Sequence, residues 1–181
     1  MKYLLLVVIV AFSFSSAAAD FETSQHNFDF EMNQVSLQVR QMTEQRKDHI
    51  QVGYKLKDVK IEYRYVDAKD TEQRFRATYS LFGNKNLSIK PRLEYRLFND
   101  KDSVFRLRNK VVLKHSVKDF VLWIELQPGL TLNDMSIDTQ TRTGFNYKMN
   151  KNVSFGPFFQ LNTNNLDRKS SWIGTNFLIK F

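Results

Sequence analysis

The chain of 181 residues contains no cysteine. No disulfide can therefore cross-link the fold, which must be held together by burial and hydrogen bonding alone. Apart from one apolar run near its start, the chain has no long apolar run. Because a transmembrane helix needs about 20 consecutive apolar residues, no such helix is expected. Since only helices and closed barrels span membranes, these absences leave a soluble protein or a β-barrel.

Residues 1–19 have the pattern of a secretory signal peptide. Lys2 precedes an unbroken apolar run that ends at Phe12, and small residues follow it. Ala17 and Ala19 fit the A-x-A cleavage pattern, so cleavage is expected after Ala19. A transmembrane anchor is the alternative, but the run is too short to span a bilayer. The mature chain is long enough for one domain.

The chain is basic, with a formal net charge of +8 at pH 7. Loss of Lys2 with the signal peptide lowers this charge to +7. In an exported protein such a charge favours acidic ligands, an anionic membrane surface or nucleic acid as partners. Nucleic acid is the least expected of the three for an exported barrel, so we expect no nucleic-acid partner.

Apolar and polar residues alternate with period 2 through nearly the whole mature chain. In the segment 59–65, for example, Ile61 and Tyr63 alternate with Glu62 and Arg64. Such alternation is typical of β-strands with two different faces. It predicts ten strands, at 35–41, 49–57, 59–65, 74–82, 87–98, 105–114, 120–127, 139–149, 153–161 and 172–181.

The breaks between these strands alternate between tight ones, such as 57–58 and 83–86, and longer ones, such as 43–48. Gly, Asn, Asp and Ser supply their turn chemistry. Strands joined by successive hairpins predict an all-β, antiparallel up-and-down barrel over residues 33–181. Residues 20–32 do not fit the pattern and are expected to be an N-terminal lead-in, mobile or a partial strand.

The choice between a soluble barrel and a membrane barrel depends on which face carries which residues. Three observations favour a transmembrane barrel of about ten strands, with twelve possible. The strands run about 9–12 residues, as tilted spanning strands do. Their number is even, and aromatic residues lie near strand ends on the apolar face, where an interfacial girdle would lie. These are Tyr65, Phe75, Phe105, Phe120, Phe155 and Phe181.

A soluble ligand-binding barrel of the lipocalin type is the alternative, since its inward face would be equally aromatic; that class has eight strands. In the membrane barrel the apolar face meets lipid and the polar face lines the lumen. We expect the strand 172–181 to close the barrel by pairing with 35–41. Both termini should then lie on the periplasmic side, with the longer breaks outside.

The polar face carries many more cations than acids. Its expected acids are Glu62, Glu94 and Glu125, and most Asp residues fall in breaks. Unpaired cations in a dry core are costly, so the lumen should be wet or hold anions. Alternatively, the cations form a face that water solvates, or they pair with acids and plug the barrel. The sixteen expected cations are Arg40, Lys55, Lys60, Arg64, Arg74, Arg76, Lys90, Arg92, Arg96, Arg106, Arg108, Lys110, Lys114, Arg142, Lys148 and Lys180.

Catalysis and metal binding have little support in the sequence. No histidine is placed to activate the lumenal serines, and His49 with Asp48 is a poor pair. Metal-ligand spacing is absent. We expect no enzyme activity, no catalytic residues, no metal and no cofactor. The histidines are His26, His49 and His115, and the lumenal serines are Ser36, Ser80 and Ser88.

Two stretches resemble the oligogalacturonate-specific (KdgM-like) porin family of outer-membrane barrels. The first is "VSLQVRQMTEQRKDHIQVGYKL", and the second is "GFNYKMNKNVSFGPFFQLNTNNLDRKSSWIGTNFLIKF". The resemblance implies a narrow barrel with an arginine-rich lumen that passes acidic oligosaccharides. The family usually has twelve strands, so a smaller barrel favours small anions. Candidate anion-facing residues are Arg40, Arg64, Arg74, Arg76, Lys90, Arg92, Arg96, Arg106, Arg108, Lys110 and Arg142.

The resemblance also gives meaning to the last residues. Phe177, Ile179 and Phe181 are similar to the C-terminal signature that the barrel assembly machinery reads. We therefore expect a monomeric protein of the bacterial outer membrane, in contact with lipid and lipopolysaccharide. Its expected function is passive, anion-selective passage of acidic saccharides or small anions. The alternative is a non-conducting barrel that binds acidic ligands as an adhesin or structural protein.

Overall fold

The computed structural model describes residues 23–42, 48–67, 71–164 and 167–181. The expected signal peptide lies outside these residues. No helix within the described ranges is long and apolar enough to cross a membrane. The described chain forms the strands β1 Thr23–Met32, β2 Val35–Met42, β3 Asp48–Leu56, β4 Val59–Asp67, β5 Glu72–Tyr79, β6 Phe82–Gly83, β7 Leu87–Phe98, β8 Val104–Val117, β9 Phe120–Thr131, β10 Ile137–Lys148, β11 Val153–Asn164 and β12 Asp167–Lys180.

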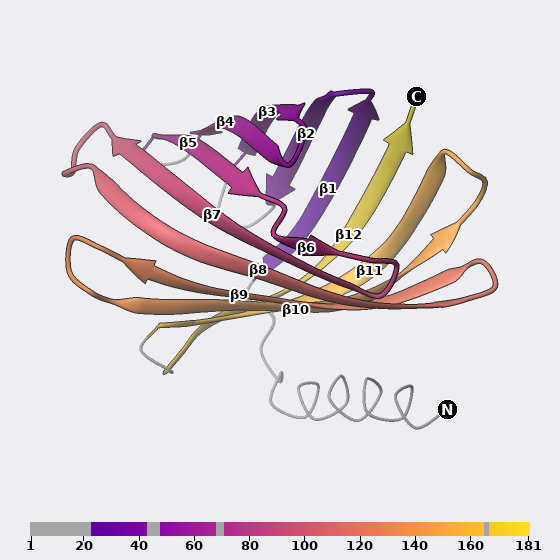
Figure 1. The fold of residues 1–181 in the computed structure, drawn as a ribbon. Coiled ribbons are helices and arrows are strands. Elements are labelled where there is room, and N and C mark those ends of the chain that lie inside the picture. Colours follow the sequence, from indigo (N-terminus) through magenta and orange to yellow (C-terminus); the bar gives the residue numbers. More distant parts are fainter. Residues whose placement is uncertain (1–22, 43–47, 68–70, 165–166) are drawn as a thin grey trace.

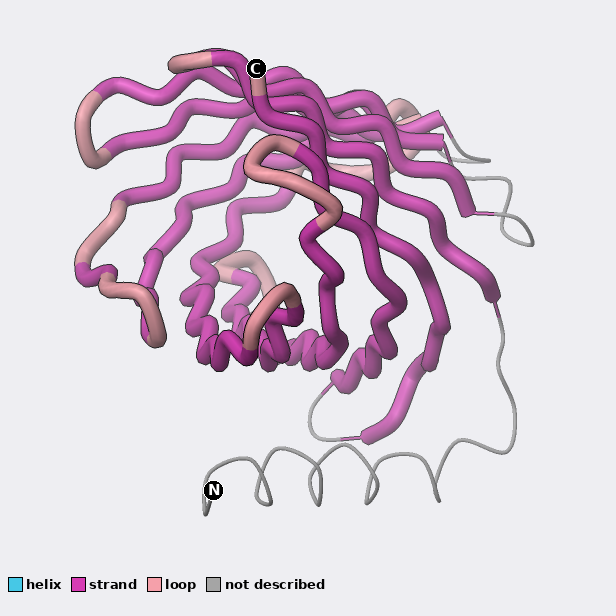
Figure 2. The backbone as a smooth tube through the Cα atoms, turned by 90° about the vertical axis from the view of Figure 1, so that its right-hand side faces the viewer, coloured by secondary structure: helices cyan, strands magenta, loops and turns pink. Residues whose placement is uncertain are grey.

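These strands form one closed sheet in which sequence neighbours pair antiparallel (Figure 1). β5 pairs with β7, and the two-residue β6 continues along β7 after an interruption at 80–81. β1 and β12 pair in parallel and close the wall. The wall therefore contains eleven strands, with β6 as an additional short strand. Figure 2 shows the strands curving round a common axis.

The predicted fold class, an all-β antiparallel up-and-down barrel, is confirmed. Nine of the ten predicted segments coincide with a single strand, and the segment 74–82 is divided between β5 and β6. The expected even number of strands is wrong, because β1 makes eleven. The expected closing pair is wrong, because β12 pairs with residues 23–31 and not with 35–41. The stretch expected to be a lead-in supplies this strand, β1, which pairs with β2 on its other side. An odd number of strands in a meander makes the first and last run in the same direction, which explains the parallel pair.

The two ends of the barrel differ in their connections. The turn end carries the connections 33–34, 57–58, 80–86, 118–119 and 149–152, and the loop end carries, among the described residues, the connections 99–103 and 132–136. β1 begins at the loop end, whereas β12 ends at the turn end (Figure 1). The expectation that both termini lie on the same side is therefore wrong for these strands.

The apolar face of each strand points outward and the polar face points inward. In β3, for example, Ile50 and Val52 are exposed while His49 and Gln51 are buried. The same alternation runs through β4, where Ile61 is exposed. Because a soluble barrel buries its apolar face, this orientation is the inverse of a lipocalin and the one that a lipid-facing wall requires.

Aromatic side chains form two bands on the outer face, one near each end. Near the loop end, Tyr63 pairs with Phe75 and Tyr95 with Phe105, with ring centroids 5.3 and 4.5 Å apart. Near the turn end, the band contains Phe120, Tyr147, Phe155, Phe177 and Phe28. Bands at both ends are the arrangement of interfacial girdles in membrane barrels.

Large and small side chains alternate round one level of the inner wall. Phe158 of β11 lies between two cross-strand glycines, Gly144 of β10 and Gly174 of β12. Beyond them lie Trp123 of β9 and Gln25 of β1. Cβ atoms at Gly144 and Gly174 would come within 2.9 and 2.5 Å of the Phe158 side chain. The glycines therefore make room for a ring that fills this part of the lumen.

Candidate functional site

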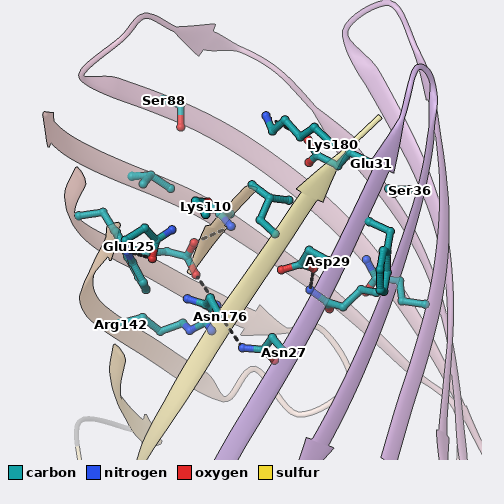
Figure 3. Close-up of a pocket in the computed structure, with 18 of the residues that line it drawn as sticks. Asn27, Asp29, Glu31, Ser36, Ser88, Lys110, Glu125, Arg142, Asn176 and Lys180 are labelled. Atoms are coloured by element: carbon teal, nitrogen blue, oxygen red, sulfur yellow. Dashed lines mark hydrogen bonds and ion pairs between the residues drawn. The ribbon is translucent and has the colours of Figure 1, made fainter. Parts of the chain in front are cut away.

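A cavity of about 1060 Å³ occupies the lumen and extends from mid-barrel to the turn end. At mid-barrel its lining includes Asn27, Glu125 and Arg142, and at the turn end it includes the 149–152 connection and Lys180. Figure 3 shows these side chains converging from β1, β9, β10 and β12. Most of the lining is charged or amide-bearing, so the cavity is suited to an ionic or polar ligand.

All eleven predicted anion-facing residues lie on the inward face of their strands. Nine of them line the cavity, namely Arg40, Arg64, Arg74, Arg76, Lys90, Arg92, Arg108, Lys110 and Arg142. Arg96 and Arg106 are not part of its lining. They lie closer to the loop end, where Arg96 contacts Glu72 and Glu94, and Arg106 contacts Asp138.

Two glutamines connect the arginines on one side of the lumen. Gln51 Oε1 accepts hydrogen bonds from Arg64 Nε at 2.7 Å and from Arg76 Nη1 at 2.9 Å. Gln38 Oε1 accepts a bond from Arg64 Nη2 at 2.9 Å, and the Gln38 amide donates to Asp29. Arg64 is thus held by neutral acceptors, which position its guanidinium without cancelling its charge.

A buried cluster of charges lies on β5 and β7 toward the loop end. Glu94 is 0% exposed and contacts Arg76 at 2.5 Å and also Arg96. Glu72 contacts Arg74 at 2.6 Å and Arg96 at 3.5 Å. Three arginines and two acids therefore form one network. Arg74 and Arg76 also line the cavity, and the rest of the network packs the lumen wall beyond it.

Glu125 of β9 is the acid at the centre of the opposite wall. It contacts Lys110 at 2.5 Å and Arg142 at 3.5 Å, and it accepts a hydrogen bond from Gln127 at 2.6 Å. Gln127 Oε1 in turn accepts a bond from Arg92 Nη2 at 3.0 Å. Arg92, like Arg64, is positioned by an amide rather than by a carboxylate.

The lumen holds more acids than the three expected from the sequence. Glu72, Asp138, Asp29 and Glu31 also carry inward ion pairs or hydrogen bonds. The sequence pattern places Glu72 and Asp138 in breaks, but both lie in strands that begin earlier than predicted. It places the two acids of β1 in the lead-in, although they alternate with apolar residues in the stretch "NFDFEM".

Some inward cations nevertheless have no acid partner within the described residues. They include Arg40, Arg64, Arg92, Lys90, Lys114 and Lys148, and each of these lines the cavity. Cations on the wall of a cavity bounded by a low-dielectric barrel raise the local potential and concentrate anions. The additional acids lower the predicted charge imbalance, but an uncompensated positive charge remains at the cavity.

Arg142 adds an aromatic surface to the cavity wall. Its guanidinium carbon lies 4.4 Å from the ring centroid of Phe158 and 5.8 Å from that of Trp123. Such cation–π contacts hold an arginine in a fixed orientation while its edge N–H groups stay available. The Trp123 indole donates to Asn146 Oδ1 at 3.2 Å.

The loop end contains a well-defined turn at 132–136. The Ser136 hydroxyl and backbone N–H donate to Asp134 Oδ1 at 2.7 and 3.0 Å. These hydrogen bonds lower the pKa of the Asp134 carboxyl below its usual range. Met135 between them has a φ of 54°. The turn therefore keeps a negative charge at the barrel rim.

The histidines do not converge. His26 lies on the outer face against Thr175, His49 is buried in the lumen, and His115 is exposed. Asp48 faces away from the lumen that His49 enters. In the described part of the chain, no group of three or more His, Cys, Asp or Glu side chains could hold a metal ion.

No protein-family model matches the chain, and no curated protein matches it either.

The electrostatic character of the cavity is testable because the chain has no cysteine of its own. A thiol introduced by Ser88→Cys would line the cavity near Lys90 and Lys114. We expect an anionic methanethiosulfonate to react there faster than a cationic one by about tenfold, after correction for intrinsic reactivity. Asn99→Cys, in an exposed loop-end connection, is the control and should show little preference. Equal rates at both positions would contradict a positive cavity.

Proposed function

We propose that this chain is an outer-membrane β-barrel that passively passes anions, either small ones or acidic saccharides. The observation that carries the proposal is the set of cavity cations without an acid partner among the described residues, which includes Arg40, Arg64, Lys90, Arg92 and Lys114. The guanidinium group of arginine binds carboxylate and phosphate oxygens in a bidentate manner. Selectivity in pores arises from such rings of charged side chains.

The outer face supports the membrane part of the proposal. A closed wall leaves no unpaired sheet edge, which lipid would not tolerate. Its outward side chains are largely apolar, and aromatic bands lie near both ends. The partners that follow are the lipid bilayer, lipopolysaccharide and the barrel assembly machinery, with acidic oligosaccharides or other anions as ligands. We propose a monomer, since the wall closes within one chain.

Reconstitution in planar bilayers under a KCl gradient tests the channel. We expect a reversal potential of the sign that chloride permeation gives. The variant Lys90→Glu with Arg92→Glu should shift that potential toward cation selectivity, because each substitution exchanges a positive for a negative charge at the cavity. Lys57→Glu with Lys118→Glu makes the same change in charge on exposed turns and should shift it much less.

A cation-selective wild-type channel would refute anion selectivity. An equal shift in both double variants would mean that the net charge of the protein, and not the cavity, sets the preference. Folding of each variant is checked by resistance to SDS until boiling.

The second candidate, a non-conducting barrel that binds acidic ligands, has its own support. Glu94 and its two arginines form a buried network, and Gln25, Gln160 and Ser171 are also completely buried inside the wall. These groups narrow the lumen beyond the cavity. A folded, SDS-resistant protein that binds acidic glycans on cells but gives no conductance would favour this candidate.

A further inference from the structure

Two arginines face the mid-lumen with unused hydrogen-bond donors. Within the described residues, Arg40 of β2 makes no side-chain hydrogen bond or ion pair, and its Nε is buried. Arg142 of β10 reaches one acid, Glu125, at 3.5 Å, while its Nε and Nη2 are buried without a partner. Buried polar groups normally have a partner, so unpaired guanidinium N–H groups indicate an absent acceptor.

These two arginines lie within electrostatic range of each other. Both line the same cavity, and the positive charge of Arg142 acts on Arg40. Two like charges in a low-dielectric lumen repel each other unless an anion lies between them. The nearby acids are already engaged, since Asp29 accepts from Gln38 and Glu125 binds Lys110.

The surroundings hold the pair in place. Phe158 stacks under Arg142 at 4.4 Å, and the flanking glycines fix the ring. Between the two arginines run β1, β12 and β11, and Asn27 Nδ2 of β1 donates to Asn176 Oδ1 of β12 at 2.7 Å. Both asparagines line the cavity (Figure 3). These uncharged amides supply no countercharge to either arginine.

We propose that Arg40 and Arg142 form a discrete, saturable oxyanion site at mid-lumen, which binds one carboxylate or phosphate group between their guanidinium groups. The site rests on the proposed function, because it gives the anion-attracting lumen one defined binding position. Anions reach it from the turn end, toward which the cavity extends. Trp123 lies 5.8 Å from the Arg142 guanidinium and reports on its position.

Fluorescence titration tests the site. The chain has two tryptophans. Trp172→Phe leaves Trp123 as the only one, and it removes an indole N–H that has no partner. In this background we titrate inorganic phosphate and, separately, glucuronate, with chloride keeping the ionic strength constant. We expect a saturable change in Trp123 fluorescence with at least one of the two probes, and the probe that saturates identifies the preferred oxyanion.

Arg40→Gln is the decisive variant because it removes one half of the pair without touching Trp123. It should weaken probe binding by about tenfold or more, as should Arg142→Gln, since charge-assisted hydrogen bonds are lost. Lys148→Gln removes another cavity cation outside the pair and should weaken binding by less than about threefold. SDS resistance identifies any variant that does not fold, and Arg40→Gln and Arg142→Gln test the pair independently.

Absence of saturation with both probes would overturn the site, as would equal weakening in Arg40→Gln and Lys148→Gln. The bilayer measurement separates this outcome from failure of the proposed function. Anion-selective conductance without saturable binding would refute the site and leave the channel standing. Saturable binding without conductance would refute the channel and leave the site standing.

Discussion

Replacement of Gly156 by alanine is expected to prevent folding or to lower the free energy of unfolding by at least about 3 kcal/mol. A Cβ at this position would lie 2.7 Å from the carbonyl carbon of Phe145 and 2.8 Å from the Cα of Asn146. Both are backbone atoms of the neighbouring strand β10. They cannot turn away as a side chain would, so relief of the clash must separate β10 from β11.

The local strand pairing makes the barrel more sensitive to a substitution at Gly156. Pro157, the next residue of β11, has no N–H to donate, and the regular β10–β11 register is interrupted between Gly144 and Tyr147. Few ladder hydrogen bonds are therefore available to hold the strands together against a new clash. Urea unfolding in lipid vesicles, followed by tryptophan fluorescence, measures the effect.

Gly83→Ala is the matched control. No heavy atom lies within 4 Å of a Cβ at Gly83, which is exposed in β6. The same added methyl group should change stability by no more than about 0.5 kcal/mol. Similar losses in the two variants would mean that the close approach of β10 and β11 does not exist in the folded barrel.

Replacement of Glu94 by glutamine is expected to cost about 3–5 kcal/mol, because it leaves Arg76 buried without its countercharge and Arg96 with only Glu72, at 3.5 Å. Glu94 is completely buried, and Arg76 and Arg96 both contact it. Glutamine keeps the shape and part of the hydrogen bonding. The decrease in the free energy of unfolding therefore measures the effect of the removed charge and not that of a packing defect. Urea unfolding measures it as for Gly156→Ala.

Glu31→Gln provides the control for an exposed pair. Its partner is Lys180 at 3.2 Å, and the two side chains are 49% and 53% exposed. Solvent-exposed ion pairs contribute little, so the expected loss is below about 1 kcal/mol. Adding Arg76→Gln to Glu94→Gln should recover part of the loss, since the double variant removes an uncompensated cation. A loss in Glu94→Gln no larger than that of Glu31→Gln would contradict the buried network.

The positions of the strands could be predicted from the sequence because alternation is a local property. Nine of the ten predicted segments each form one strand, and all eleven predicted anion-facing residues lie on the inward face. Side chains alternate between the two faces of a strand, so a run of apolar residues at every second position assigns its polar residues to one common face.

β1 was harder to predict because its outward face is less apolar. Phe28 and Phe30 alternate with acids, but His26 lies on the outer face and bonds Thr175. The first half of the strand therefore lacks the apolar stripe on which the prediction depends. Its assignment as a strand comes from pairing with β2 and β12, which are separated from each other by more than a hundred residues in the sequence.

The sequence by itself determined an antiparallel barrel with one apolar and one cationic face, because these features follow from period-2 patterning and turn chemistry. Only the tertiary structure decided which face points inward, which acids meet which cations, and which strand closes the wall. These depend on the register between strands and on contacts across the lumen. The pairing of Arg76 with Glu94, the closure of β12 on β1 and the shared cavity of Arg40 and Arg142 all join residues that no local pattern connects.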